Sequence, residues 1–233
     1  MTTLFNYNLS KHTGTMFIKE IQTIRKFARS SKGLKLLINE YQGFEWYKKQ
    51  IINKLKSPIK NCEFDLNKNY IDFNLILGKQ LNYWDSISSN FIYAQKVTED
   101  YKLIWPKSKF VPCHGDLTLS NVIFRENKHP FIIDWENFYK KESWGYDVCY
   151  FLISCLVMPS IVFKKKISVN EFILFEKLWK NFYRKKFFPY SSDPINYLKK
   201  RFKIIFKNRK YEDFFPNKIS KKLGSQISEI TKI

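Results

Sequence analysis

The sequence predicts an α+β fold of two lobes, in which a small antiparallel sheet with one main helix precedes a mostly helical part. Three observations lead to this prediction. Apolar and polar residues alternate over much of residues 1–25 and again over Tyr70–Gly78, as in half-buried strands. Apolar residues recur at helical spacing from Gly33 to Leu55. Longer apolar and aromatic segments, again with helical spacing, dominate the chain beyond Val148.

Composition and charge limit the class of protein. A hydrophobic fraction of 44% with 18% aromatic residues indicates a globular chain rather than a disordered one. The formal net charge of +20 favours an anionic partner, either a small ligand or a polyanion such as nucleic acid. Because lysines are spread along the whole chain, we favour the small ligand and expect no nucleic-acid partner. The four cysteines form no CxxC pair and have no zinc-ligand spacing, which is typical of reduced thiols in a cytoplasmic protein.

The most apolar run, Val148–Phe163, is about 16 residues long, whereas a membrane span needs about 20. It predicts a buried helix that ends near Pro159. No charged-then-apolar leader precedes the first strand, so secretion is not predicted. The following Lys164-Lys165-Lys166 would allow a peripheral membrane contact, which we do not predict.

The N-terminal segment predicts two strands, Leu4–Asn8 and Met16–Ile21, joined by a polar turn at Ser10–Thr15. Lys19 lies in the second strand and faces opposite to Ile18. A lysine on the inner face of a small sheet needs an anionic partner, because burying an unpaired charge is costly. The alternative is a lysine on an edge strand that faces solvent.

Glu40 and Glu45 are the acids of the helix predicted for Gly33–Leu55. Either could pair with Lys19 across the interface between sheet and helix. Glu40 lies nearer the apolar stripe, whereas Glu45 suits a solvated pair with a lysine three or four residues away.

The second half of the chain predicts a helix from Asp85 to Tyr101, the apolar helix from Val148, and an aromatic helix beyond Ser168 whose stripe belongs to the core. Asp147 directly precedes the apolar helix, where a carboxylate caps free amide groups. The tail from about residue 210 is basic and polar.

Polar residues with fixed spacing occupy the centre of the sequence: His114-Gly115-Asp116-Leu117-Thr118-Leu119-Ser120-Asn121, and then Ile132-Ile133-Asp134-Trp135-Glu136. The apolar triplets Val122–Phe124 and Phe131–Ile133 predict two short strands, with a turn between them. Acidic and amide side chains at the mouth of such a hairpin can hold a divalent metal beside a general base.

This pattern, HGDLTLSN followed by IIDWE, resembles the aminoglycoside phosphotransferase and choline kinase-like family, whose members are small-molecule kinases with a protein kinase-like fold. The resemblance is strongest over about Phe110–Leu156. It implies that the chain is an enzyme that moves the γ-phosphate of ATP to a hydroxyl of a small molecule with the help of Mg²⁺. Sugars, amino alcohols and aminoglycoside-like compounds are the acceptor classes that the resemblance implies.

The resemblance also implies roles for the central residues. Asp116 would be the catalytic base, and Asn121 and Asp134 would hold Mg²⁺. His114 would support the loop by hydrogen bonding. Glu136 would be either an outer partner of the metal or a surface acid.

At the nucleotide end, the resemblance implies that Lys19 grips the α- and β-phosphates of ATP and that Glu40 holds this lysine in place. The Ser10–Thr15 turn would cover the phosphates, and Tyr70–Gly78 would lead into the hinge that faces adenine. Asp147, at the start of the apolar helix, would support the site as a recurring feature of the family.

Two lobes are expected on this basis, a reduced nucleotide-binding lobe of residues 1–78 and a catalytic helical lobe of residues 79–233. The first is expected to be reduced because it has few residues and no G-x-G-x-x-G loop. One alternative function is a kinase-like binding module with weak or no catalysis. Another is a nucleic-acid binder that works through the basic stretch Lys199–Lys210. Nothing in the sequence predicts an oligomeric state.

Overall fold

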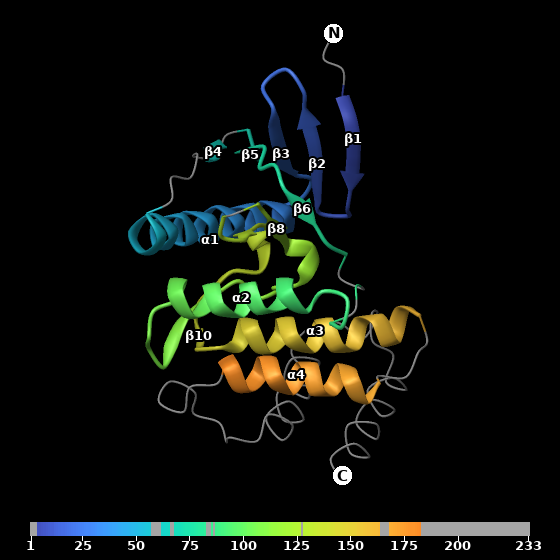
Figure 1. Ribbon diagram of the computed structural model, residues 1–233. Coiled ribbons are helices and arrows are strands. Elements are labelled where there is room, and N and C mark those ends of the chain that lie inside the picture. The colour runs from blue at the N-terminus through green and yellow to red at the C-terminus, as the bar shows by residue number, and fades with distance from the viewer. Residues whose placement is uncertain are drawn as a thin grey trace.

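The computed structural model describes residues 4–56, 62–65, 68–82, 85, 87–126, 128–163 and 168–182. A sheet and the long helix α1 form the N-terminal lobe, and three helices lie below them in the C-terminal lobe (Figure 1). Short strands and loops fill the layer between α1 and these helices. The predicted α+β class with two lobes agrees with this arrangement. The expected basic tail and the stretch Lys199–Lys210 lie outside the described residues.

The N-terminal sheet has five strands in the order β1-β2-β3-β5-β4, and every neighbouring pair is antiparallel. Its elements are β1 (Leu4–Leu9), β2 (Thr13–Ile18), β3 (Thr23–Ala28), β4 (Cys62–Asp65) and β5 (Tyr70–Asn74). The sequence predicts β1, β2 and β5 but neither β3 nor β4, so this lobe is less reduced than expected.

The second predicted strand is wrong at its end. β2 stops at Ile18, and Lys19 to Gln22 form a turn in which the Gln22 amide donates to the Lys19 carbonyl at 3.3 Å. Gln22 adopts a positive φ of 50°, which reverses the chain into β3. Lys19 is therefore an exposed residue of a turn.

Helix α1 (Ser31–Leu55) begins two residues before the predicted Gly33 and ends as predicted. Ser30 caps it, because its hydroxyl accepts a hydrogen bond from the Gly33 amide at 3.1 Å. Its buried face contacts the sheet on one side and the C-terminal lobe on the other (Figure 1). That face consists of Gly33, Leu37, Glu40, Gly43, Phe44, Tyr47 and Ile51.

The C-terminal lobe contains α2 (Phe91–Ile104), α3 (Tyr146–Val162) and α4 (Val169–Phe182), which stack against one another. α2 begins at Phe91 rather than at the predicted Asp85. α3 continues through Pro159 to Val162 instead of ending there. The aromatic stripe of α4 is buried as predicted, with Phe175, Trp179 and Phe182 in the core.

Short elements connect the lobes and form the site. They are β6 (Lys79–Gln80), β7 (Phe110–Cys113), the 3-10 turn η1 (Leu119–Asn121), β8 (Val122–Phe124), β9 (Phe131–Ile132), the 3-10 turn η2 (Trp135–Asn137) and β10 (Tyr139–Ser143). β8 and β9 form the predicted hairpin, and β6 adds to it as a third strand. Among the described helices, none is long and apolar enough to cross a membrane.

Candidate active site

The loop that carries Asp116 is held from below by Asp147. The two carboxylate oxygens of Asp147 accept hydrogen bonds from the backbone amides of His114 and Gly115, each at 2.9 Å. Asp147 is fully buried, so both bonds form away from water, where they are strong. The predicted role as a cap before the apolar helix is wrong in detail. α3 already begins at Tyr146, and the amides that Asp147 holds belong to the loop after β7.

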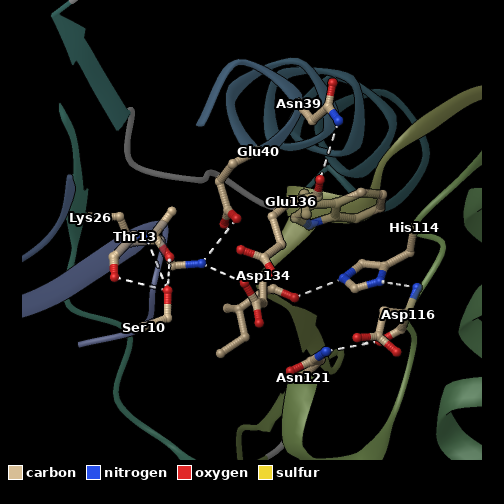
Figure 2. Close-up of polar contacts among 12 residues, drawn as sticks. Ser10, Thr13, Lys26, Asn39, Glu40, His114, Asp116, Asn121, Asp134 and Glu136 are labelled. Carbon is tan, nitrogen blue, oxygen red and sulfur yellow. Dashed lines mark hydrogen bonds and ion pairs between the residues drawn. The ribbon is translucent and has the colours of Figure 1, made fainter. Parts of the chain in front are cut away.

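His114 joins this loop to the strand that leads to Asp134. Its Nδ1 accepts a hydrogen bond from the Asp116 amide at 3.2 Å, and its Nε2 donates to the Ile133 carbonyl at 2.8 Å. These two partners require the neutral imidazole with its proton on Nε2. The ring also packs on Trp135, with 4.6 Å between the ring centroids. These contacts agree with the supporting role predicted for His114 (Figure 2).

Asn121 is oriented by the same loop. Its carboxamide nitrogen donates to the backbone carbonyl of Asp116 at 2.8 Å, and its backbone carbonyl accepts a hydrogen bond from the Ile133 amide at 3.0 Å. Because the nitrogen faces the loop, the carboxamide oxygen faces the other way, and Asn121 lines the cavity between the lobes. Asp116 and Asn121 thus lie next to each other (Figure 2), and of the two it is Asn121 that lines the cavity.

The lysine of the site is Lys26 and not the predicted Lys19. The Nζ atom of Lys26 lies 2.9 Å from Glu40 Oε2 and 2.5 Å from Asp134 Oδ1, so one ammonium group bridges α1 and the segment after β9 (Figure 2). Glu40 is the acid that pairs with it, as expected of the two helix acids, whereas Glu45 pairs with its neighbour on the helix, Lys48. The prediction fails for Lys19 because the sequence argument did not recognise β3. This strand places Lys26 at the cavity.

The charges of this cluster shift one another's pKa values. Burial raises the pKa of Glu40 to about 7, against the opposing charge of Lys26. Burial alone would lower the pKa of Lys26, but the negative charges of Glu40 and Asp134 outweigh it and hold the pKa above its usual value. For Asp134, burial would raise the pKa, yet the charge and hydrogen bond of Lys26 hold it below the usual range. Lys26 and Asp134 are therefore both charged at neutral pH.

Asp134 has an unusual backbone conformation, and the next residue, Trp135, is firmly packed in the core. It adopts the left-handed region with φ 67° and ψ 58°, which ends the run of β9 and turns its carboxylate toward Lys26. Trp135, fully buried, packs on Tyr47 of α1 at 5.0 Å between centroids and donates from Nε1 to the Ile132 carbonyl at 3.1 Å. The helix can approach this close because Gly43 has no side chain, and a Cβ there would lie 2.8 Å from the Trp135 Cβ.

A cavity of about 730 Å³ extends from this cluster toward the segment after β5. Lys26, Glu40, Asn121 and Asp134 line its polar part. The middle part is apolar, with Ile24, Phe44, Phe73, Leu75, Ile76, Leu77, Ile123, Phe131 and Ile133. Thr15 lines it too, and strand register places Thr15 directly opposite Lys26. An apolar slot with a fixed cation and acids at one end fits a nucleotide, whose base is flat and whose phosphates are charged.

The predicted loop above the phosphates is closed upon itself. The Ser10 hydroxyl accepts hydrogen bonds from the amides of His12 at 3.2 Å and Thr13 at 2.9 Å. The turn is also tied to the start of α1, where the Arg29 amide donates to the His12 carbonyl at 2.8 Å. The amides of His12 and Thr13, in the turn expected to cover the phosphates, are therefore bonded to Ser10.

The oxygen atoms of Asn121 and Asp134 are of the kind that Mg²⁺ prefers, and both residues line the cavity. In the part of the chain that the structure describes, no three His, Cys, Asp or Glu side chains gather as a metal site made of protein alone. Mg²⁺ commonly uses one or two protein ligands and completes its shell with phosphate oxygens and water. Glu136 is half-buried, and burial first and then the negative charge of Asp134 raise its pKa. Its role as an outer partner of the metal stays a prediction.

Sequence reasoning missed Lys26. Thr15 lay in the turn expected to cover the phosphates and Trp135 in the IIDWE pattern, but neither received a role of its own. A usable signal for Lys26 existed: Thr23–Ala28 contains the β-branched Thr23 and Ile24 and the aromatic Phe27, and it ends two residues before the helix cap at Ser30, so it reads as a strand that leads into α1.

Comparisons with known proteins agree with this architecture. Residues 73–152 match the model of a family described as "Phosphotransferase enzyme family". A mutant of aminoglycoside 2'-phosphotransferase-IIIa in complex with GDP aligns over 100% of this chain and 90% of its own, with 10% identity and a TM-score of 0.59. The wild-type GDP complex aligns over 98% of this chain and 93% of its own, with 9% identity and a TM-score of 0.51. No curated protein sequence matches the chain.

A third structure is the choline kinase LicA from Streptococcus pneumoniae, which aligns over 99% of this chain and 94% of its own. Its identity is 12%, and its TM-score of 0.47 is too low to indicate a shared fold by itself. The two alignments above 0.5 confirm the two-lobed protein kinase-like fold. The family match covers the loop of Asp116, the hairpin and the first turns of α3.

Proposed function

Because this chain resembles the aminoglycoside phosphotransferase and choline kinase-like family across its catalytic segment, we propose that it is a small-molecule kinase. It would move the γ-phosphate of a nucleoside triphosphate, with ATP as the expected donor, to a hydroxyl group of the acceptor. The single observation that carries this proposal is the convergence of Lys26, Glu40 and Asp134 on one cavity that also contains Asn121.

At the donor end, Lys26 would bind the α- and β-phosphates, and Glu40 would keep its ammonium group in place. Thr15 supports this assignment because it is the cross-strand neighbour of Lys26 and its hydroxyl can donate to a phosphate oxygen. The apolar middle of the cavity, next to the Asn74–Leu77 segment, would take the base.

At the transfer end, Asn121 and Asp134 would hold Mg²⁺ through their side-chain oxygens. Such an ion bridges phosphate oxygens and neutralises the charge that develops during transfer. Asp134 now contacts Lys26, so its carboxylate would be shared between the lysine and the ion when both ligands are bound.

Asp116 would receive the acceptor. Its carboxylate would orient the acceptor hydroxyl and take the proton as the new oxygen–phosphorus bond forms. The bond between the γ-phosphorus and the bridging oxygen would break in the same step, and the nucleoside diphosphate would leave. Asp147 and His114 would fix the position and orientation of the loop that carries Asp116. Catalysis by positioning requires the base to be held in such a fixed place relative to the acceptor hydroxyl.

The acceptor is proposed only as a class: a sugar, an amino alcohol or an aminoglycoside-like compound. The net charge of +20 disfavours a polycationic drug and favours a neutral, zwitterionic or phosphorylated acceptor.

The test is a release assay for nucleoside diphosphate with Mg-ATP and a panel of these three acceptor classes. One class should give turnover above the rate without acceptor. Asp116→Asn should abolish this turnover and leave nucleotide binding, measured by calorimetry, nearly unchanged.

A kinase-like binding module is the competing function, and melting temperatures separate the two. Mg-ATP should raise the melting temperature of the wild type and raise that of Asp134→Ala by less. If no nucleoside triphosphate shifts either protein, the enzyme proposal fails.

A further inference from the structure

The nucleotide cavity has a second cationic region away from Lys26. Arg125 and Lys128, in the turn between β8 and β9, both line the cavity. Asn121 and Arg125 flank β8, so they are four residue steps apart, roughly 13 Å at the rise of an extended strand. The cavity therefore has Lys26 and Asp134 at one end of β8 and Arg125 near the other.

Strand pairing places Arg125 beside the segment expected to face the base. β6 pairs with β8 so that Lys79 lies opposite Phe124 and Gln80 opposite Ile123, and this register continues to bring Gly78 next to Arg125. A Cβ on Gly78 would lie only 3.3 Å from the Arg125 Cγ. Such a Cβ would come nearer still to Ile123 Cγ2, at 2.5 Å, and to the Phe124 carbonyl oxygen, at 2.7 Å, so the lack of a side chain at Gly78 lets the end of β8 and the first part of Arg125 pack close to the chain after Leu77.

The guanidinium of Arg125 is fixed by groups that leave its charge intact. Its Nε and Nη2 atoms donate to the His129 carbonyl at 3.3 and 3.1 Å, and its central carbon lies 5.5 Å from the centroid of the buried Phe131 ring. A carbonyl and an aromatic face are its described partners, and neither neutralises it. These bonds use one edge of the guanidinium, whose five N–H donors include two more on Nη1.

The base that suits such a group is guanine. Guanine presents two adjacent acceptors, O6 and N7, and arginine binds this edge more often than any other base edge. Adenine has N7 as an acceptor but an amino group at position 6, whose hydrogens would face the guanidinium donors. The apolar walls of the cavity bind either base equally.

We propose that Arg125 is a specificity-determining residue for the donor nucleotide and makes this chain prefer guanine over adenine nucleotides. This inference rests on the proposed function and refines its donor. The expected preference for GTP over ATP is on the order of tenfold, which is the scale of a good contact between arginine and the guanine edge.

The first test uses the unaltered protein and three nucleotides with Mg²⁺: ATP, GTP and ITP. Calorimetric binding and the shift in melting temperature are both measured. ITP keeps O6 and N7 but lacks the 2-amino group of guanine, so it should bind about as well as GTP, and both should bind more tightly than ATP. Binding of ITP at the level of ATP would overturn the role given to the O6 and N7 edge.

The second test uses Arg125→Met, which keeps the length of the stem but removes the donors, with Lys128→Met as a matched control in the same turn. Arg125→Met should lose the preference for GTP and leave ATP affinity within about twofold, whereas the control should keep the preference. Equal weakening of both nucleotides would mean that Arg125 only holds the turn, and the proposal would be overturned.

The outcomes also separate this inference from the proposed function. If ATP and GTP bind equally well to the wild type, the nucleotide site stands and only the assignment of Arg125 fails. If neither binds, the proposed function fails with it.

Discussion

The ammonium group of Lys26 lies 2.5 Å from the Asp134 carboxylate, which joins β3 of the N-terminal lobe to the segment after β9. The same group contacts Glu40 of α1, so one side chain connects three parts of the fold. In the absence of ligands, the lysine balances two acids whose charges would otherwise repel each other. Lys26 thus holds the two acids in fixed positions at one end of the cavity.

Removing this lysine should affect stability and binding together. In Lys26→Met, Glu40 is left almost fully buried without its cation, and breaking a buried pair in this way typically costs about 3–5 kcal/mol. We expect a lower free energy of unfolding in urea and the loss of any shift in melting temperature with Mg-nucleotide.

Lys19→Met is the matched control, because it removes a lysine of the same lobe that is exposed in a turn. It should keep both the stability and the nucleotide response of the wild type. A nucleotide response that disappears in Lys19→Met but persists in Lys26→Met would restore the assignment made from sequence.

Asp147 should stabilise the loop that carries Asp116 more than it stabilises its own helix, α3. Asn in its place has a single carbonyl oxygen, so one of the two amides of His114 and Gly115 would lose its acceptor and face an amino group instead. Hydrogen bonds to charged groups contribute about 1.5–3 kcal/mol, and Asp147→Asn should lose stability on that scale.

Kinetics distinguish the positioning role of Asp147 from a purely structural one. The turnover number of Asp147→Asn should fall far more than the KM for the nucleotide rises, because the loop orients Asp116 rather than the phosphates. A proportionate loss in both values, which tracks only the folded fraction, would contradict this role.

The central signature was readable from sequence because its chemistry is local. The spacing of His114, Asp116, Asn121 and Asp134 depends on one loop and one hairpin, so a linear pattern captures it. Lys26 depends on long-range pairing, since its partners Glu40 and Asp134 are 14 and 108 residues away. Because the strand at Thr23–Ala28 was not recognised, the lysine of the preceding turn, Lys19, was selected instead of Lys26.

The two hydrogen bonds that Asp147 accepts from the loop amides could not be predicted from the sequence for a related reason. Helix-start carboxylates usually bond amides of their own helix, and only the tertiary fold brings the loop amides there instead. The long helix α1 and the apolar helix α3 were predictable because their periodicity is continuous and strong.

The pair of Asp100 and His129 makes a prediction about pH. Asp100 on α2 is buried, and one of its oxygens bonds His129 Nδ1 at 2.8 Å while the other has no described partner. Burial raises the pKa of Asp100, which the hydrogen bond and charge of His129 only partly oppose. The native state therefore holds this proton more tightly than the unfolded chain does.

It follows that stability should fall as pH rises through the window that starts near the unfolded value of about 3.9 and ends at the native pKa. Asp100→Asn removes this titration. As the pH rises above about 3.9, the free energy of unfolding of the wild type should decline relative to that of the variant. A constant difference across this range would show that the pKa of Asp100 is not raised.

Gly33 should resist substitution although it lies in a helix. Alanine normally stabilises a helix interior by about 1 kcal/mol relative to glycine. Here a Cβ would lie 2.0 Å from the His12 carbonyl oxygen, which is backbone and cannot rotate away. Gly33→Ala should therefore destabilise the protein by about 1–3 kcal/mol, the usual range for overpacking.

Lys35→Ala, at an exposed position of the same helix, gives the propensity effect without the contact and should be neutral or slightly stabilising. Thermal unfolding of both variants checks this. A stabilised Gly33→Ala would mean that the turn at His12 moves aside at no cost.

The hydrogen bonds between Asp147 and the amides of His114 and Gly115 join positions that are 33 and 32 residues apart. The chain segment that they close contains Asp116, Asn121 and Asp134. The other residues proposed to bind phosphate, Lys26 with its partner Glu40 and also Thr15, lie outside this segment. An inserted residue between Asp116 and Asp134 would change the spacing of the side chains proposed to act at the transferring phosphate. Changes of chain length outside residues 114–147 leave this segment unaltered. The lobes and their other connections could therefore vary widely in length around the same spacing of proposed site residues.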